Sequence, residues 1–375
     1  MSSIQTHSLS ADYRGQSQDL PPPFEANATQ RLLEIFSQKH PFLDKTPCVE
    51  ELWLNTPLSP IKGAKISRIQ MIREPYSQGA ESRTFLCLKT TRKPGIGYKL
   101  YLLKAPIKDR PLLPIRFEIE KSCSDHLITL KIKELEKGHI LQKFANQSDL
   151  EDLVFNSIKK NLRLTHDQLL SISKQLLTKV EMLHQLHIAH LDLKPLNILI
   201  NENKLRDLST ELEVFITDFG LSDRFSSTKI KVGLNPTGTY CFFPPEFVYR
   251  TEEERRLERW VNPFQADLFS LGLTLFFLSS GNYLPYCIEP HLPRKTKQDF
   301  KTLVDLYHQK IQLAFSSMDS TKLLECEQLH KNLIKNYVPP IPGLRNIIFE
   351  LLRVLPVNRL TAGACLKHLM EAKKP

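Results

Sequence analysis

Two short segments of the chain place carboxylates, an amide and a lysine at close spacing. Residues 190–197 read HLDLKPLN, and residues 218–220 read DFG. Moving a phosphoryl group from a nucleotide to a hydroxyl requires a carboxylate to orient the attacking oxygen, oxygen ligands for a divalent metal ion and a cation near the transferred group. The two segments supply all of these residue types, in Asp192, Lys194, Asn197 and Asp218. Their spacing therefore indicates phosphoryl transfer.

Both segments resemble the protein-kinase superfamily, whose catalytic loop reads HRDLKPxN and whose metal loop reads DFG. The resemblance implies that Asp192 accepts the proton of the substrate hydroxyl and that Lys194 contacts the phosphoryl oxygens. It also implies that Asn197 and Asp218 hold Mg²⁺, with Mn²⁺ as an alternative, against the phosphates of ATP. His190 is the catalytic-loop histidine of this pattern. The expected activity is transfer of the γ-phosphoryl of ATP to hydroxyls of a protein substrate.

The later segment GTYCFFPPE, which ends at Glu246, resembles the GTxxYxAPE segment that closes a kinase activation loop. By this resemblance Thr239 bridges Asp192 and Lys194. Together with the LKP of the catalytic loop, it indicates the serine/threonine branch of the family. Glu246 is expected to pair with Arg359, in the run PVNRLTA, because an arginine and a carboxylate can form a bidentate, charge-assisted contact.

Leu191 stands where the family usually has an arginine that binds a phosphate on the activation loop. A leucine side chain cannot form that charge-assisted contact. The sequence therefore predicts activity that does not require phosphorylation of this loop, although acceptors are present at Ser226, Ser227, Thr228 and Thr237.

Two helices are predicted around the catalytic loop. Apolar residues recur at three- and four-residue steps over 169–183, which predicts an amphipathic helix that leads into His190. Residues 267–278, ended by Gly281, predict a helix that is apolar on all sides, and such a helix belongs in the centre of a large domain. The resemblance implies that Asp267, at its start, bonds the backbone of the catalytic loop.

Three histidines, His184, His187 and His190, share this region. Histidine is the commonest metal ligand, but no carboxylate or cysteine lies at ligand spacing from these three. Core packing and hydrogen bonding to the backbone are therefore their expected roles.

The segment expected to cover the phosphates is less regular than the catalytic loop. The family uses the turn GxGxxG, whereas the run SQGAESRT offers one glycine, Gly79, with Ser77 and Ser82 in place of the outer two. Glycine matters there because backbone amides must approach phosphate closely. A plain hairpin turn explains this run equally well.

Lys104 lies in an apolar strand, residues 98–105, that resembles the VAIK strand of the family. By this resemblance it reaches the α- and β-phosphates, and Lys99 is the alternative. Glu120, on the following helix, is its expected partner because the family often has Phe three residues earlier. Glu118 stays open as the alternative partner.

Residues 140–145, ILQKFA, are expected to form the strand and hinge that hold adenine through main-chain groups. Gln142 would be the gatekeeper, with Phe144 and Ala145 in the hinge. Asp149 either bonds the ribose or caps the helix that follows it. The sequence leaves both roles open.

The fold class implied is α+β: a bilobal protein-kinase fold with a small β-rich N-lobe that contains one main helix, and a larger, mainly α-helical C-lobe. The N-lobe is expected over 61–145 and the C-lobe over 146–375, with an enlarged insertion at about 290–338. Residues 1–60 are expected to be a partly disordered extension with a short helix at 29–36. With 375 residues, 41% of them hydrophobic, the chain can bury a substantial core.

Seven cysteines without a CxxC pair predict a reducing compartment, namely the cytosol, or the host cytosol for a translocated bacterial effector. The chain has 51 Lys and Arg against 41 Asp and Glu, which gives a formal net charge of +10. No basic run or aromatic platform accompanies this charge, so ATP and a protein substrate are the expected partners rather than nucleic acid or a membrane. The oligomeric state is not predicted.

Three other functions stay open. A pseudokinase scaffold is favoured by the reduced glycine turn and by Leu191. A small-molecule kinase shares the carboxylate and asparagine pattern, but the segment from Gly238 to Glu246 and Arg359 argue against it, because by the resemblance they shape a platform that docks peptides. A basic interaction module would bind nucleic acid or lipid in a salt-dependent manner and would have no affinity for ATP.

Overall fold

The computed structural model describes most of the chain. The described residues are 26–39, 49–56, 65–72, 75, 77–78, 82–90, 98–106, 114–134, 140–145, 149–204, 210–226, 230–232, 238–248, 259–289, 291–292, 296–317 and 319–372. They fall into two compact units. The first unit comprises 1–124 and 130–144, and the second comprises 125–129 and 145–375.

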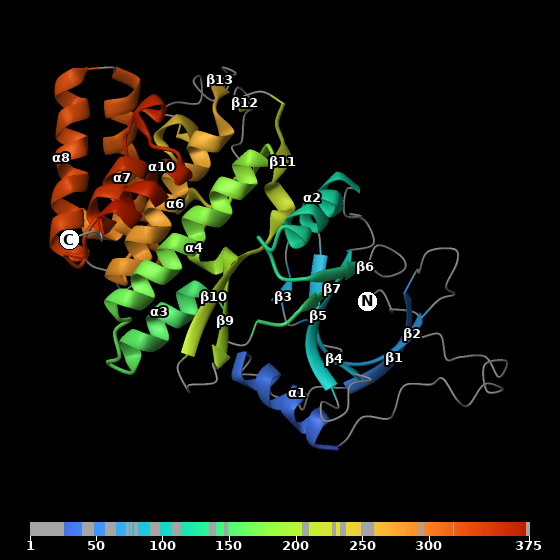
Figure 1. Ribbon diagram of the computed structural model, residues 1–375. Helices are drawn as coiled ribbons and strands as arrows, with labels where there is room; N and C mark the ends of the chain where they lie inside the picture. Colours follow the sequence, from blue (N-terminus) through green and yellow to red (C-terminus); the bar gives the residue numbers. More distant parts are fainter. Residues whose placement is uncertain are drawn as a thin grey trace, which may run out of the picture. The chain divides into compact units, whose positions relative to one another are not determined.

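The first unit is built on an antiparallel sheet (Figure 1). Its strands pair in the order β1-β2-β4-β5-β7-β6, and β3 pairs with β4. The strands are β1 (Val49–Thr56), β2 (Lys65–Ile72), β3 (Ser77–Gln78), β4 (Ser82–Thr90), β5 (Tyr98–Pro106), β6 (Ile132–Glu134) and β7 (Ile140–Lys143), and the helices are α1 (Ala26–Lys39) and α2 (Pro114–Asp125).

Alternate residues of the sheet enter two separate apolar clusters, as the two-residue period of a strand requires. Phe85 and Cys87 of β4 belong to one cluster, whereas Leu86 and Leu88 belong to the other, which also contains Leu32 and Phe36 of α1. The short helix predicted at 29–36 is therefore present, and it covers one face of the sheet. Strand β1 extends this sheet, so ordered structure begins inside the stretch expected to be a partly disordered extension.

In its described residues the second unit is mainly helical, with three short two-stranded sheets. Its helices are α3 (Leu150–Lys159), α4 (His166–Gln185), α6 (Pro263–Ser280), α7 (Lys297–Ser317), α8 (Ser320–Tyr337), α9 (Leu344–Leu351) and α10 (Ala362–Glu371). Its strands are β8 (Ile188–Ala189), β9 (Ile198–Lys204), β10 (Thr210–Ile216), β11 (Asp223–Arg224), β12 (Ile230–Val232) and β13 (Arg259–Val261). The pairs are β9 with β10, β8 with β11, and β12 with β13.

Helix α4 confirms the amphipathic helix predicted upstream of the catalytic loop. The Thr165 hydroxyl accepts a hydrogen bond from the backbone of Gln168, whose side chain accepts one from the backbone of Thr165 in return. This capping box starts the helix. The periodic apolar residues are all buried, namely Leu169, Ile172, Leu176, Val180 and Leu183.

Helix α6 is the central helix of the second unit, and nearly all of its residues are buried. It begins at Pro263, four residues before the start expected at Asp267, because Asn262 caps the first turn and proline suits the first helical position. At Gly272 a Cβ would lie 2.9 Å from a methyl carbon of Leu352, so glycine permits close packing there. No helix in the described part of the chain combines the length and apolar composition needed to cross a membrane.

Candidate active site

The catalytic loop is attached to the centre of the second unit by one buried carboxylate. Asp267 Oδ2 accepts the backbone N–H of His190 at 2.7 Å, and its Oδ1 accepts that of Leu191 at 2.8 Å. Leu191 has a φ of 63°, a left-handed conformation that costs free energy for a leucine. The two charge-assisted hydrogen bonds to Asp267 stabilise this conformation.

The ring of His190 connects the catalytic loop to the DFG segment. Its Nδ1 accepts the backbone N–H of Asp192 at 3.3 Å, so its Nε2 carries the proton and donates to the Thr217 carbonyl at 2.9 Å. The ring centroid also lies 5.1 Å from that of Phe219. Two of the three histidines of this region make the non-metal contacts expected of them: His190 bonds backbone, and His184 Nε2 lies 3.2 Å from Asp267 Oδ2.

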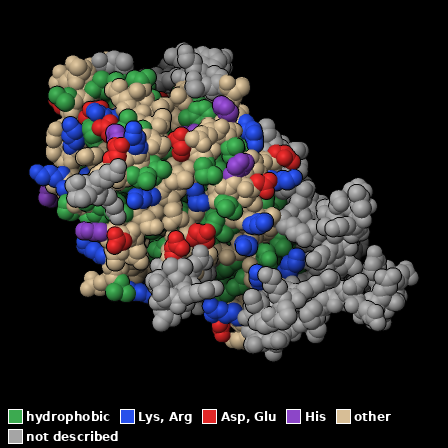
Figure 2. Space-filling model, in the orientation of Figure 1, with side chains coloured by type: hydrophobic (Ala, Val, Ile, Leu, Met, Phe, Trp, Pro, Cys, Tyr) green, Lys and Arg blue, Asp and Glu red, His purple; other side chains and the backbone are tan. Residues whose placement is uncertain are grey.

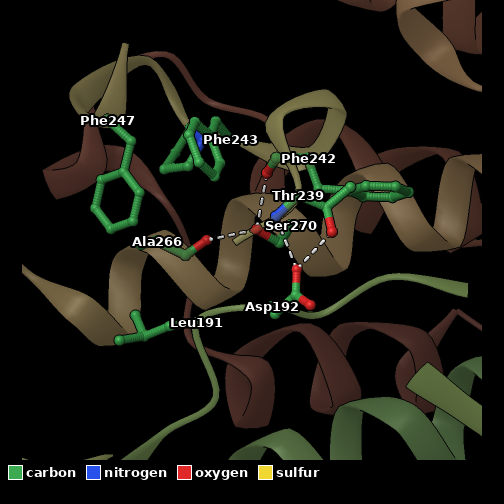
Figure 3. A pocket seen from close by; sticks show the side chains of 9 residues that line it. Leu191, Asp192, Thr239, Phe242, Phe243, Phe247, Ala266 and Ser270 are labelled. Atoms are coloured by element: carbon green, nitrogen blue, oxygen red, sulfur yellow. Dashed lines mark hydrogen bonds between the residues drawn. The ribbon is translucent and has the colours of Figure 1, made fainter. Parts of the chain in front are cut away.

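The Asp192 carboxylate is the centre of a hydrogen-bond network inside the second unit. Its Oδ1 accepts from the backbone N–H and the hydroxyl of Thr239, each at 2.8 Å (Figure 3). Its Oδ2 accepts from Lys194 Nζ at 2.7 Å and from Asn197 Nδ2 at 3.1 Å. Lys194 Nζ also donates to the Thr239 hydroxyl at 2.6 Å. Thr239 therefore bridges Asp192 and Lys194 in the arrangement expected from the sequence.

The two residues expected to hold metal are linked through the backbone. Asn197 Nδ2 donates to the Asp192 carbonyl at 2.8 Å as well as to the carboxylate, so the amide oxygen takes no part in these two contacts. The N–H of Thr217 donates to the Asn197 carbonyl at 2.9 Å, which places the next residue, Asp218, beside the catalytic loop. Asp218 is exposed and has a φ of 64°. An amide oxygen and a carboxylate are hard ligands that suit Mg²⁺.

The end of the activation segment is tied to the far end of the chain by a buried ion pair. Arg359 Nη1 and Nη2 donate to Glu246 Oε1 and Oε2 at 2.6 and 2.8 Å. The guanidinium also donates to the carbonyls of Arg353, Gln265 and Val354. The bidentate pair expected from the sequence is therefore present, and its remaining N–H groups have partners.

Leu191 packs against an apolar cluster of the activation segment and α6. The cluster consists of Phe243, Phe247, Val248, Val261 and Ala266. Beside it lies a cavity of about 10 Å³, which is close to the minimum for one water molecule (Figure 3). The cavity is lined by Leu191, Asp192, Thr239, Phe242, Phe243, Pro244, Phe247, Ala266 and Ser270. Of the loop acceptors named above, Ser226 is exposed, whereas Ser227, Thr228 and Thr237 lie outside the described residues.

In the first unit, the expected lysine and glutamate are in contact. Lys104 Nζ, on β5, lies 3.2 Å from Glu120 Oε2, on α2. The Glu120 side chain is 5% exposed, whereas the alternative partner Glu118 is on the exposed side of the helix. The helical period explains this choice, because residues two apart face in different directions.

The segment expected to cover the phosphates forms a hairpin between β3 and β4. Ser77 pairs with Thr84 and Gln78 with Arg83, and Ser82 begins β4. Gly79 lies outside the described residues, so its predicted role stays a prediction.

The expected hinge follows β7. Gln142 is buried on this strand, Phe144 packs against the cluster that contains α1, and Ala145 is buried. Asp149 Oδ1 accepts the backbone N–H of Asp152 at 2.9 Å and so caps α3. One of the two roles left open for Asp149 is therefore present, and the ribose contact stays a prediction.

Sequence reasoning missed a contact between the C-terminal helices and the activation segment. His308 of α7 lies with its Nε2 2.7 Å from the carbonyl oxygen of Tyr240. Burial lowers the pKa of His308 to about 4, and the hydrogen bond to Tyr240 opposes this only in part. No short motif signals this contact, because it joins a side chain to a backbone atom far away in the sequence.

The chain matches the protein kinase domain model over residues 118–370. It belongs to the protein kinase family. The matched part begins within α2 and includes every site residue of the second unit. The fold class expected from the sequence is confirmed by a solved structure of Rad53 residues 1–466 in complex with AMP-PNP, which aligns with a TM-score of 0.51 at 23% identity. That alignment covers 80% of this chain and 64% of the Rad53 chain.

Several curated kinases are similar to part of the chain. The probable serine/threonine-protein kinase fhkB of Dictyostelium discoideum is 30% identical over 222 residues, which are 58% of this chain and 16% of the relative. The serine/threonine-protein kinase CHK1 of Saccharomyces cerevisiae is 24% identical over 234 residues, which are 60% of this chain and 38% of the relative. The chain thus spans less than two thirds of these kinases.

Proposed function

We propose that this kinase-family chain transfers the γ-phosphoryl of ATP to serine or threonine hydroxyls of a protein substrate. The observation that carries the proposal is the Asp192 carboxylate, which is held by Thr239, Lys194 and Asn197. A carboxylate fixed in this way can orient a hydroxyl and accept its proton as the new bond forms. The serine/threonine kinases among the relatives support the same substrate class.

The network around Asp192 defines what must change when substrate binds. A carboxylate has about four acceptor positions, and the two oxygens of Asp192 already receive four donors, from Thr239, Lys194 and Asn197. A substrate hydroxyl must therefore displace one of them. Lys194 is the donor that can leave, because its ammonium gains a new anionic partner when the γ-phosphoryl oxygens arrive.

Phosphoryl transfer then takes place in one displacement. The hydroxyl oxygen forms a bond to the γ-phosphorus while the bond from that phosphorus to the bridging oxygen of ADP breaks. The hydroxyl proton passes to Asp192. Lys194 stays beside the transferred group, where its charge offsets that of the phosphoryl oxygens.

Asn197 and Asp218 would hold Mg²⁺, or Mn²⁺, in this reaction. Bound Mg²⁺ would neutralise negative charge on the phosphates. The donor set fits this ion, because Mg²⁺ is usually held by one or two carboxylates together with substrate phosphates and water. Within the described residues no cluster of three or more His, Cys, Asp or Glu side chains offers a complete protein-only site.

For the nucleotide, we propose that Lys104 binds the α- and β-phosphates and that Glu120 orients it. Their 3.2 Å contact supports this role. The remaining nucleotide contacts are proposed by family resemblance alone, at Gly79, Ser82, Gln142, Phe144, Ala145 and Asp149. ATP as the donor is further supported by the AMP-PNP in the solved structure that shares the fold.

The direct test is transfer of radiolabel from [γ-³²P]ATP to a generic protein substrate in the presence of Mg²⁺. Asp192→Asn should reduce the initial rate by about 10²-fold or more, because proton acceptance and orientation are both lost. Asp223→Asn removes one exposed carboxylate of β11 and should leave the rate unchanged. Absence of transfer by the unmodified chain, with ATP-Mg²⁺ still bound, would favour the pseudokinase alternative.

We further propose that activity does not depend on phosphorylation of the activation segment. The support is the packing of Leu191 on the apolar cluster that contains Phe243, Phe247 and Ala266, a contact of the catalytic loop with the segment that involves no phosphate. Phosphatase-treated and autophosphorylated protein should therefore transfer phosphate at similar initial rates. A many-fold loss after phosphatase treatment would contradict this.

A further inference from the structure

Helix α7 brings a buried histidine to the activation segment. His308 is 1% exposed, and its Nε2 lies 2.7 Å from the carbonyl oxygen of Tyr240. The two rings also lie against each other, with centroids 4.3 Å apart and planes 33° apart. The helix belongs to the stretch that the sequence marks only as an enlarged insertion.

The chemistry of this contact fixes the tautomer of His308. A carbonyl oxygen only accepts, so Nε2 must carry the proton and donate it. The low pKa that burial gives the ring keeps it neutral near pH 7, and a neutral imidazole has only this one N–H. Its Nδ1 has no hydrogen-bond partner among the described residues. The single donor of the ring is therefore committed to the Tyr240 carbonyl.

The bonded carbonyl belongs to the same short turn as Thr239. The N–H of Phe242 donates to the Thr239 carbonyl at 2.8 Å, and the N–H of Phe243 donates to the Tyr240 carbonyl at 3.1 Å. At the start of this turn, the N–H and hydroxyl of Thr239 both donate to Asp192. His308 thus bonds the carbonyl of Tyr240, and Thr239, the residue before Tyr240, bonds the Asp192 carboxylate.

We propose that His308 is a positioning residue for phosphoryl transfer: by donating to the Tyr240 carbonyl it fixes the turn that places the Thr239 hydroxyl between Asp192 and Lys194. This proposal rests on the proposed kinase function. Displacement of reacting groups by about 1 Å can lower a rate by about 10²-fold, so a hydrogen bond outside the reacting atoms can affect turnover strongly.

His330 of α8 provides a matched comparison. It is also fully buried, burial also lowers its pKa to about 4, and its Nδ1 lies 2.9 Å from the Leu352 carbonyl. Its Nε2 lies 3.2 Å from the Tyr307 hydroxyl. Its hydrogen bonds involve Tyr307 of α7 and Leu352, the residue that follows α9, and its ring centroid lies 6.5 Å from that of Phe269 of α6. Removing His330 therefore tests general loss of packing, and removing His308 tests the turn.

The experiment measures kcat and the KM for ATP with the full chain and a generic protein substrate. His308→Leu should lower kcat by about 10- to 100-fold while KM for ATP stays within about twofold. His308→Gln should recover most of the loss, because the Nε2 of glutamine can donate from nearly the same place. His330→Leu should lower the melting temperature and leave kcat near that of the unmodified chain.

The proposal is overturned if His308→Leu retains kcat, if His308→Gln fails to recover it, or if His330→Leu loses kcat to the same extent. Amide hydrogen exchange of Phe242 and Phe243 gives a readout that does not depend on catalysis. Exchange there should accelerate in His308→Leu and not in His330→Leu. If the unmodified chain transfers no phosphate, the kinase proposal fails, and this exchange pattern alone supports or overturns the role of His308 in fixing the turn.

Discussion

The catalytic loop of the second unit and the Lys104 strand of the first unit hold their site residues in different ways. Asp192 accepts four hydrogen bonds, three from side chains and one from the backbone N–H of Thr239, and two backbone N–H groups of its loop donate to Asp267. Lys104 is placed by the register of β5 and contacts Glu120 of α2. The catalytic side is thus fixed by a dense polar network, and the lysine is fixed by the sheet that carries it.

This difference predicts that substitutions in the second unit disturb both folding and rate, whereas those in the first unit change the rate with less effect on folding.

The largest effect is expected at the pair of Glu246 and Arg359. Glu246→Gln leaves a buried guanidinium without its full counter-charge and should cost about 3–5 kcal/mol of unfolding free energy. Chemical denaturation measures this loss.

Glu327→Gln is the control for that measurement. Its partner Arg353 lies at 2.6 Å, but the Arg353 side chain is 27% exposed, so the loss should be about 1 kcal/mol or less. Equal losses of unfolding free energy in the two variants would show that burial does not make the pair of Glu246 and Arg359 more stabilising than the pair of Glu327 and Arg353.

The next effect is expected at Asp267. Asp267→Asn replaces one acceptor of the His190 and Leu191 amides with an amide donor, so the catalytic loop should shift and kcat should fall by about 10²-fold. Steady-state kinetics measure this fall, with Asp223→Asn as the control for removal of a carboxylate. Unchanged kcat would mean that the loop conformation does not depend on this anchor.

Mild acid should weaken the second unit through its two buried histidines. The pKa of His308 and that of His330 are both lowered from 6.5 to about 4, chiefly by burial. Between these values the unfolded chain binds more protons than the folded one, so stability falls as the pH drops from about 6.5 towards 4. From pH 6.5 to 5 each histidine accounts for about 2 kcal/mol at most.

The measurement is the unfolding free energy across this pH range for the unmodified chain and for His308→Gln and His330→Gln. Each variant should show a shallower decline than the unmodified chain. A decline that is equally steep in both variants would assign the acid sensitivity to other groups.

The smallest effect is expected in the first unit. Glu120→Gln keeps the shape of the side chain but removes the charge beside Lys104, so we expect about tenfold lower kcat/KM for ATP and little change in melting temperature. Glu118→Gln, at the exposed position of the same helix, should change neither quantity. A loss in Glu118→Gln alone would reassign the partner of the lysine.

Sequence reasoning anticipated the contacts that belong to short motifs. The bonds of Thr239 with Asp192 and Lys194, and the pair of Glu246 and Arg359, follow from residue types at family positions. The predicted start of α6 at Asp267 was wrong, although the sequence contained the correct signal. Asn262 followed by Pro263 is a normal helix beginning.

Other contacts had no sequence signal. The bond from His308 to the Tyr240 carbonyl depends on where α7 packs, and a backbone acceptor leaves no mark on residue type. The packing of Leu191 on the cluster with Phe243 and Phe247 is a similar case. The residue type of Leu191 indicates that it cannot bind a phosphate, but it does not indicate which side chains it contacts. Such contacts follow from tertiary packing, which no local pattern encodes.

The apolar anchor at Leu191 also bears on how such a protein would be regulated. Where an arginine binds a phosphate on the activation segment, kinases and phosphatases can form and remove that contact reversibly. The packing of Leu191 against aromatic rings involves no phosphate, so adding or removing a phosphate does not form or break this contact. Under the proposal that activity does not depend on phosphorylation of this segment, control of the activity would fall to synthesis, degradation, confinement or a bound inhibitor.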